Sequence, residues 1–182
     1  MIKNSKKVIF YAGAILLAVF YVVVLWWGQN PKVGLEYRMY YITHELSDWP
    51  GYGKLSYVPG TVEYCTGLKD RNGKDVTWQV CRRKGKGWNT EQYEGSKNSA
   101  DKAYVYYVLA EALEHAEYQV EINEFTGDGE VFVYCNDKNV GSFRQTGVFT
   151  FEIGELKKEE LTTIRFEAED CTFSLWSTMI TE

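Results

Sequence analysis

The chain has 182 residues, of which 45% are apolar and 16% aromatic, and its formal charge is −5. A chain of this length forms one ordinary domain and has little room for a second. Its apolar content and its three prolines exclude a disordered or collagen-like chain, and the acidic balance argues against nucleic acid as a partner, because proteins that bind it carry a basic footprint.

The first element is an uncharged apolar stretch, Val8–Trp27. As a helix, its 20 residues extend over about 30 Å, which matches the hydrocarbon thickness of a lipid bilayer. Three lysines lie within residues 1–7, so the positive-inside rule predicts a cytoplasmic amino terminus and a single-pass protein of the cell membrane. The alternative is a cleaved signal peptide, whose apolar run would be shorter and would end in small residues rather than in Leu25-Trp26-Trp27.

Residues 28–33 read as a juxtamembrane connector, and residues 34–182 as an extracytoplasmic domain. All 25 acidic residues follow the apolar stretch, whereas three of the 20 basic residues precede it. The part of the chain after the apolar stretch therefore carries a net charge of −8, and anionic headgroups or polymers would repel it unless a local basic patch met them.

The domain is predicted to be an all-β sandwich of the jelly-roll kind. Period-two patterns bounded by turn residues recur along it, and about ten strands in roughly 150 residues suit such a sandwich. The predicted strands are Leu35–Thr43, Lys54–Thr66, Asp75–Arg83, Ala103–Leu109, Tyr118–Phe125, Glu130–Cys135, Val140–Phe143, Val148–Ile153, Thr162–Glu169 and Thr172–Ile180. Asn72-Gly73 and Asn136–Asn139 are hairpin turn signals, and only Ala110–Ala116 is typical of a short helix.

A family resemblance rests on the second half of the chain. Its residues are the loop Gly87-Trp88-Asn89-Thr90-Glu91 with Gly95, the strand Ala103–Leu109, then Tyr118–Ile122, Val131–Cys135 and Val140-Gly141. This pattern, over about residues 83–181, resembles the carbohydrate-binding-module-like jelly rolls that lie outside the membrane on bacterial sugar-transferring membrane proteins and their accessory subunits. The resemblance implies a glycan ligand and a polytopic membrane glycosyltransferase as partner.

Catalytic motifs are scarce in the sequence. It has two histidines and lacks the HExxH, CxxC and GxSxG patterns of metalloproteases, redox proteins and hydrolases. A glycosidase would need two carboxylates about 5–10 Å apart, and Glu91 and Glu94 are the nearest candidates. A loop glutamate in an acidic domain is more often solvated, so we expect a non-catalytic protein and keep an anchored glycan hydrolase as an alternative.

Recognition of a ligand is better supported than a reaction. Trp49, Tyr52 and Trp88 lie in loops with Gly or Pro, where aromatic rings are available to stack on sugars, and Glu91 lies beside Trp88. The opposing interpretation is that these rings plug the end of the sandwich. A basic cluster, predicted to contact an anionic group, contains Arg82, Arg83, Lys84 and Lys86.

The four cysteines offer two disulfide candidates. The Asn72-Gly73 turn would place Cys65 and Cys81 nearly opposite each other on neighbouring strands, and an oxidising compartment permits a bridge there; a second candidate is Cys135–Cys171. No metal-ligand spacing is diagnostic, and no cofactor is expected. Asp128, Glu130 or Asp170 could contribute oxygens to a structural Ca²⁺.

Three functions follow as hypotheses. The first is a membrane-anchored accessory subunit that assists a polytopic membrane glycosyltransferase in the assembly of envelope polysaccharide. The second is a free-standing surface module that binds glycans, and the third is the anchored hydrolase that uses Glu91 and Glu94.

Overall fold

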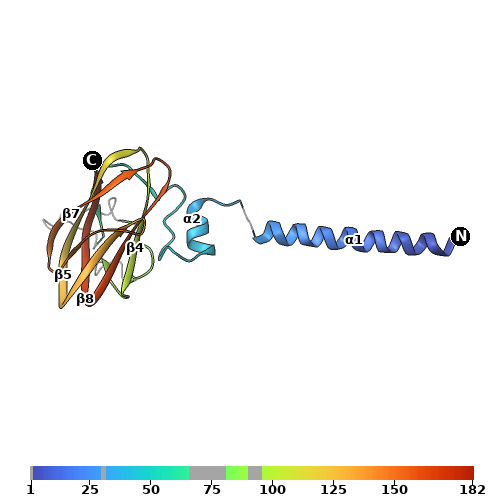
Figure 1. Ribbon diagram of the computed structural model, residues 1–182, viewed down its shortest axis with the longest axis horizontal. Helices are drawn as coiled ribbons and strands as arrows, with labels where there is room; N and C mark the ends of the chain where they lie inside the picture. Colours follow the sequence, from blue (N-terminus) through green and yellow to red (C-terminus); the bar gives the residue numbers. More distant parts are fainter. Residues whose placement is uncertain (1, 30–31, 66–80, 90–95) are drawn as a thin grey trace. The chain divides into compact units, whose positions relative to one another are not determined.

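The computed structural model describes residues 2–29, 32–65, 81–89 and 96–182, and the chain divides into two units, residues 1–34 and 35–182. The first unit contains the helix α1 (Ile2–Gln29; Figure 1). Its segment Phe10–Gln29 is long and apolar enough to cross a membrane, and its side chains are exposed. An apolar helix that is exposed on all sides is typical of a span that lipid would cover.

The second unit is a β-sandwich whose two layers share two long strands, β5 (Leu113–Cys135) and β8 (Leu161–Thr181) (Figure 1). In one layer, β4 (Lys102–Leu109) pairs with the first part of β8, which pairs with the last part of β5 and then β6 (Lys138–Phe143). In the other layer, β7 (Gly147–Leu156) pairs with the first part of β5, which pairs with the last part of β8. Short strands extend the edges: β2 (Glu63–Tyr64) and β3 (Ser96–Lys97) on β8, and β1 (Ser56–Tyr57), parallel to β4.

Both long strands pass between the layers at one place, where their pairing shifts register between Gly127 and Glu130. Gly127 and Asp170 have positive φ angles of 111° and 52°. A Cβ atom at Gly129 would lie 1.7 Å from the carbonyl oxygen of Glu169. The bend therefore needs glycine, and the paired strands turn the corner together as at a β-bulge.

The core lies between the layers. Alternate residues of β5 point into it, with Tyr118, Val120 and Ile122 fully buried. Aromatic rings join the two layers: Phe166 contacts Phe173 at a centroid distance of 5.5 Å and Tyr118 at 6.4 Å. Aromatic side chains thus supply a large part of this core.

Several predicted strands are confirmed, and others are parts of longer ones. The segments Ala103–Leu109, Val140–Phe143 and Val148–Ile153 lie within β4, β6 and β7. Four further segments are the halves of the two long strands: Tyr118–Phe125 and Glu130–Cys135 lie in β5, and Thr162–Glu169 and Thr172–Ile180 lie in β8. The turn at Asn136-Asp137 is confirmed, with φ angles of 46° and 68°.

Two secondary-structure predictions are wrong. Leu35–Thr43 is helical rather than extended, as α2 (Leu35–Tyr37) followed by a π-helical turn η1 (Arg38–Ile42). The predicted short helix Ala110–Ala116 is not helical, and its residues from Leu113 onward open β5, where they pair with β7 at Leu113↔Leu156 and Ala116↔Gly154. In both places an apolar spacing fitted two periodicities, and packing decided between them.

The region before β4 has less regular structure than predicted. Within the predicted strand Lys54–Thr66, the described residues 54–65 contain only the two-residue strands β1 and β2. Most of the predicted strand Asp75–Arg83 and the turn Asn72-Gly73 lie outside the described residues.

Candidate functional site

Five aromatic rings gather on the surface of the sandwich unit near its amino-terminal end. This aromatic cluster consists of Tyr37, Tyr40, Tyr41, Trp49 and Tyr52. Tyr41 contacts Tyr37 at a centroid distance of 4.7 Å and Trp49 at 5.5 Å. Trp49 and Tyr52 meet at 5.2 Å with their planes 85° apart, so their rings form two walls of a shelf.

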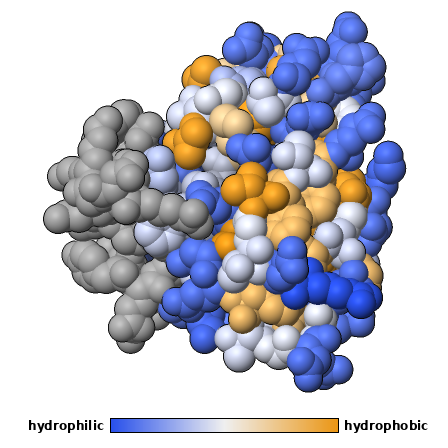
Figure 2. All heavy atoms as spheres, turned by 90° about the vertical axis from the view of Figure 1, so that its left-hand side faces the viewer, coloured by the Kyte–Doolittle hydropathy of each residue, from blue (hydrophilic) through white to orange (hydrophobic). Residues whose placement is uncertain are grey.

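The aromatic cluster is open to solvent. Tyr52 is 71% exposed and Tyr41 is 50% exposed. Seven large apolar side chains are exposed among the described residues of the sandwich unit, and Leu35, Tyr41, Ile42 and Tyr52 are four of them. This concentration of exposed apolar side chains makes the aromatic cluster the candidate binding site. On the face shown in Figure 2, apolar side chains also gather, in the middle of the described surface and with hydrophilic side chains around them.

The local fold explains why these rings meet. The turn of α2 and η1 places Tyr37 and Tyr41 four residues apart on one helical face. Met39, between them, points inward and packs with Leu46, Leu55 and Tyr106 in a second, smaller core. The carbonyl of Met39 also accepts a hydrogen bond from the amide of Glu45 at 2.7 Å, which returns the chain toward Trp49.

The loop that carries Tyr52 requires glycine on both sides. Gly51 and Gly53 have φ angles of 94° and 68°, which other residues rarely adopt. The amide of Lys54 closes the turn by donating to the carbonyl of Gly51 at 3.3 Å. The ring of Tyr52 is therefore held on a tight turn instead of a free loop.

A hollow of about 470 Å³ lies next to the aromatic cluster. The two share their supports, since α2 supplies Tyr37 to the cluster and Leu35 to the hollow, and the turn supplies Tyr52 and Gly53. The hollow is lined by Leu35, Glu36, Gly53, Ser56, Val108, Leu109, Ala110, Lys158 and Glu159. Apolar residues next to two carboxylates and an ammonium suit a ligand that has both apolar faces and hydroxyl groups.

The structure brings together two of the predicted ligand residues, Trp49 and Tyr52, but places Trp88 apart from them in the core. Trp88 is 4% exposed. Its ring contacts Phe166 and Phe173 at 5.8 and 5.6 Å, and its Nε1 donates to the carbonyl of Tyr104 at 2.7 Å. In this structure Trp88 is therefore part of the core and is not displayed for a ligand.

Other expected site residues have no described position. Glu91 and Glu94 lie outside the described residues, so a catalytic pair there stays a prediction. Sequence reasoning missed Tyr37, Tyr40 and Tyr41, because they fell in a segment read as a strand. Their i, i+3 and i+4 spacing was the signal for a shared helical face.

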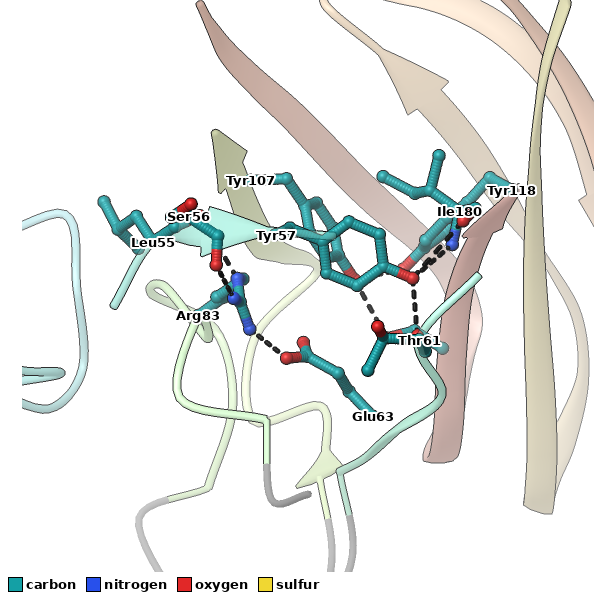
Figure 3. Close-up of polar contacts among 10 residues, drawn as sticks. Leu55, Ser56, Tyr57, Thr61, Glu63, Arg83, Tyr107, Tyr118 and Ile180 are labelled. Carbon is teal, nitrogen blue, oxygen red and sulfur yellow. Dashed lines mark hydrogen bonds and ion pairs between the residues drawn. The ribbon is translucent and has the colours of Figure 1, made fainter. Parts of the chain in front are cut away.

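The basic cluster is not a continuous contact patch. Arg82 and Lys86 are exposed and Lys84 is half-buried, but Arg83 is 7% exposed. The guanidinium of Arg83 forms an ion pair with Glu63 and donates to the carbonyls of Ser56 and Leu55 (Figure 3). The prediction is wrong for Arg83, since its charge is satisfied inside the protein.

The Arg83–Glu63 pair belongs to a buried polar network that joins β1, β2, β4 and β8 (Figure 3). The Tyr57 hydroxyl accepts a hydrogen bond from the amide of Ile180 at 2.9 Å and donates to the carbonyl of Thr61. The Tyr107 hydroxyl donates to Thr178 at 2.9 Å. Burial raises the pKa of Tyr57 to about 12, and burial also raises the pKa of Glu63 against the opposing effect of Arg83. This network fixes the segment that contains β1 and β2 to Arg83 and to β8.

All four cysteines carry free thiols, so neither predicted disulfide is formed in this structure. Cys65 and Cys81 are buried neighbours, and a hydrogen bond with Cys81, followed by burial, raises the pKa of the Cys65 thiol well above its ordinary value. Cys135 pairs with Ile164 and Cys171 with Gly127. Ile164 and Cys171 are seven residue steps apart along β8, on the order of 20 Å of strand, which excludes the Cys135–Cys171 bridge.

The residues considered for calcium, Asp128, Glu130 and Asp170, do not form a cluster of ligands in this structure. Among the described residues, no group of three His, Cys, Asp or Glu side chains could hold a metal ion. Glu130 instead forms an ion pair with Arg144 at 2.6 Å and accepts a hydrogen bond from Ser142 at 2.5 Å. Its charge is already neutralised by Arg144, so it is a poor ligand for Ca²⁺.

Comparison with solved structures finds similar β-sandwiches. The chain is similar to the CBM36-1 domain of a multidomain xylanase from the hindgut metagenome of Trinervitermes trinervoides, at 12% identity and a TM-score of 0.37, over 53% of this chain and 84% of that one. It is similar to a CBM36 module solved with calcium and xylotriose, at 14% identity and a TM-score of 0.36, over 52% and 87%. It is also similar to a family 35 carbohydrate-binding module from an environmental isolate, at 16% identity and a TM-score of 0.38, over 68% and 89%.

No protein-family model matches the sequence, and neither does any curated protein. At these scores, the likeness to solved structures says nothing about what this chain binds.

Proposed function

We propose that this chain is a membrane-anchored, non-catalytic glycan-binding protein of the cell envelope that works beside a polytopic membrane glycosyltransferase. The observation that carries the glycan-binding part is the exposed aromatic cluster with the hollow beside it. The anchor is the apolar segment of α1, and the resemblance of residues 83–181 to modules of sugar-transferring membrane proteins motivates the partner.

Glycan binding suits the chemistry of this surface. The faces of sugar rings that carry only C–H groups pack on aromatic rings, which have a polar edge in Tyr and Trp. The shelf made by Trp49 and Tyr52 offers such faces, and the carboxylates of Glu36 and Glu159 in the hollow accept hydrogen bonds from sugar hydroxyls. The acidic charge of the unit disfavours polyanions, so we propose neutral oligosaccharides as the ligand class.

Loss of an aromatic side chain of the shelf is expected to weaken glycan binding. Trp49→Ala or Tyr52→Ala in the full, detergent-solubilised chain should lower the affinity for the best-bound oligosaccharide by about 10-fold or more, since buried aromatic anchors dominate such interfaces. The ligand is chosen on an array of neutral oligosaccharides of glucose, galactose, mannose and xylose, and its affinity is measured by calorimetry.

Two matched variants control this test. Tyr52→Phe keeps the ring and should retain most of the affinity, and Val148→Ala removes an exposed apolar side chain of β7 and should change nothing. Absence of any bound oligosaccharide on the array, or equal affinities for Tyr52→Ala and the native chain, would contradict the proposed site.

The partner is tested separately. Affinity purification of the full chain from native membranes is expected to recover a polytopic membrane glycosyltransferase. Recovery of the chain alone, together with a retained affinity for glycans, would favour the second hypothesis of a free-standing surface module.

A further inference from the structure

The aromatic cluster begins close in the chain to the proposed membrane span. Helix α1 ends at Gln29 and α2 begins at Leu35, so five residues lie between them. A fully extended chain advances at most about 3.6 Å per residue, and six residue steps therefore cover no more than about 22 Å. This upper limit is a property of the covalent chain and holds for any arrangement of the two units.

Such a short tether limits what the aromatic cluster can reach. The polar headgroup layer of a bilayer is itself on the order of 5–8 Å thick on each side. A span that ends at Gln29 therefore confines Leu35, and with it the hollow that Leu35 lines, to the zone just above the headgroups. The first few sugars attached to a lipid occupy that zone.

The charge of this segment is compatible with a membrane surface. Lys32, Arg38 and Lys54 are exposed. Across residues 32–54 these three cations balance the three acidic residues of the same segment, Glu36, Glu45 and Asp48. The net charge of residues 32–54 is thus zero, with His44 neutral, whereas the sandwich unit as a whole is acidic, so anionic headgroups repel this segment less than they repel the unit as a whole.

We infer that the natural ligand is the sugar headgroup of a lipid in the same membrane, as a glycolipid or a lipid-linked saccharide, rather than a distant soluble polymer. The inference rests on the proposed function, because it requires that the aromatic cluster binds sugar and that α1 spans a membrane. A short tether raises the effective concentration of a ligand that is confined to the same surface, so that a modest intrinsic affinity is sufficient.

The experiment compares one oligosaccharide displayed on the membrane that holds the protein with the same oligosaccharide displayed on separate membranes. The full chain is reconstituted in phosphatidylcholine vesicles, and binding of the fluorescent oligosaccharide chosen on the array is followed by anisotropy. The competitor is the same oligosaccharide coupled to phosphatidylethanolamine, placed either in the vesicles that hold the protein or in separate vesicles. Insertion of about 30 Gly/Ser residues between Val33 and Gly34 lengthens the tether, and the same insert after Glu182 is the control.

Competition is expected from the glycolipid in the same vesicles, whereas the same amount in separate vesicles should have little effect. The tether insertion should weaken this competition roughly 10- to 20-fold, as effective concentration falls with the 3/2 power of linker length, and the control insertion should leave it unchanged. Equal competition from both vesicle populations, or no effect of the tether, overturns this inference while leaving glycan binding intact. Failure of the fluorescent oligosaccharide to bind at all contradicts the proposed function instead.

Discussion

Replacing Arg83 with methionine is expected to lower the free energy of unfolding by about 3–5 kcal/mol, the usual result of removing one partner of a buried ion pair. The side chains of Arg83 and Glu63 are 9% and 11% exposed. Methionine keeps much of the volume but leaves the Glu63 carboxylate buried without its counter-ion, and the carbonyls of Ser56 and Leu55 lose a donor. Urea unfolding of the full chain in detergent, followed by near-UV circular dichroism, measures the change.

Neighbouring variants separate charge from packing. Arg82→Met changes an exposed arginine one residue away and should alter stability by less than about 0.5 kcal/mol. The double variant Arg83→Met/Glu63→Gln, which removes both charges, should recover part of the loss. If Arg83→Met and Arg82→Met are equally stable, the buried pair does not hold this segment.

The pH dependence of the same variant follows from the raised pKa of Glu63. Loss of Arg83 raises this pKa further, because the guanidinium opposes the effect of burial. A carboxyl group with a folded pKa above its unfolded value of about 4.3 favours folding only when it is protonated. The difference in free energy of unfolding between the native chain and Arg83→Met should therefore be largest at pH 8 and become smaller as the pH falls toward 5. Arg83→Met/Glu63→Gln should not show this narrowing.

Truncation of Trp88 to alanine should also cost about 3–5 kcal/mol, as for a large buried aromatic residue. The indole fills the space against Phe166 and Phe173, and its Nε1 satisfies the carbonyl of Tyr104. Trp88→Phe should lose less, since it keeps ring packing and removes the hydrogen bond. Urea unfolding under the same conditions measures both variants.

The surface tryptophan provides the comparison for Trp88. Trp49→Ala should reduce glycan affinity with a much smaller loss of stability, because Trp49 is only half-buried. Trp88→Phe, if folded, should keep the native glycan affinity. If Trp88→Ala has native stability but binds no glycan, Trp88 belongs to the ligand site and not to the core.

The position of Trp88 could not be predicted from the local sequence pattern of its loop. Gly85 and Gly87 precede it, and a Cβ atom at Gly87 would lie 1.9 Å from the carbonyl of Lys102. The glycines thus let the loop backbone approach β4 closely, and this approach carries the tryptophan into the core. A Gly-x-Gly-Trp loop was compatible with either a displayed or a buried ring, and only the partner strand distinguishes them.

Arg83 illustrates the same limit for charge. Four basic residues in five consecutive positions look like a surface patch, because charged side chains are rarely buried unless they are paired. The pairing partner, Glu63, lies 20 residues earlier in the chain. Nothing in the local sequence identifies it, since the two residues meet only when the segments that carry them pack on β4 and β8.

The amino-acid sequence by itself determined the features that depend on local composition and period. These are the apolar segment long enough to span a membrane, the all-β character of the rest, the turn at Asn136-Asp137, and most of the core alternation of β4 and β5. Each depends on interactions between residues close in the chain or on the burial of one strand face, and both leave a regular pattern.

Only the tertiary structure decided which aromatic rings face solvent. Trp49, Tyr52 and Trp88 all occupy Gly- or Pro-containing loops, yet the first two join Tyr41 on the surface and the third is buried. Whether a ring is buried depends on which distant strand lies over it. The register of the long strands β5 and β8, which pass from one layer to the other, determines which strand that is. Side-chain type and local spacing are the same in either outcome, so the location of the candidate site follows from the packing of the layers.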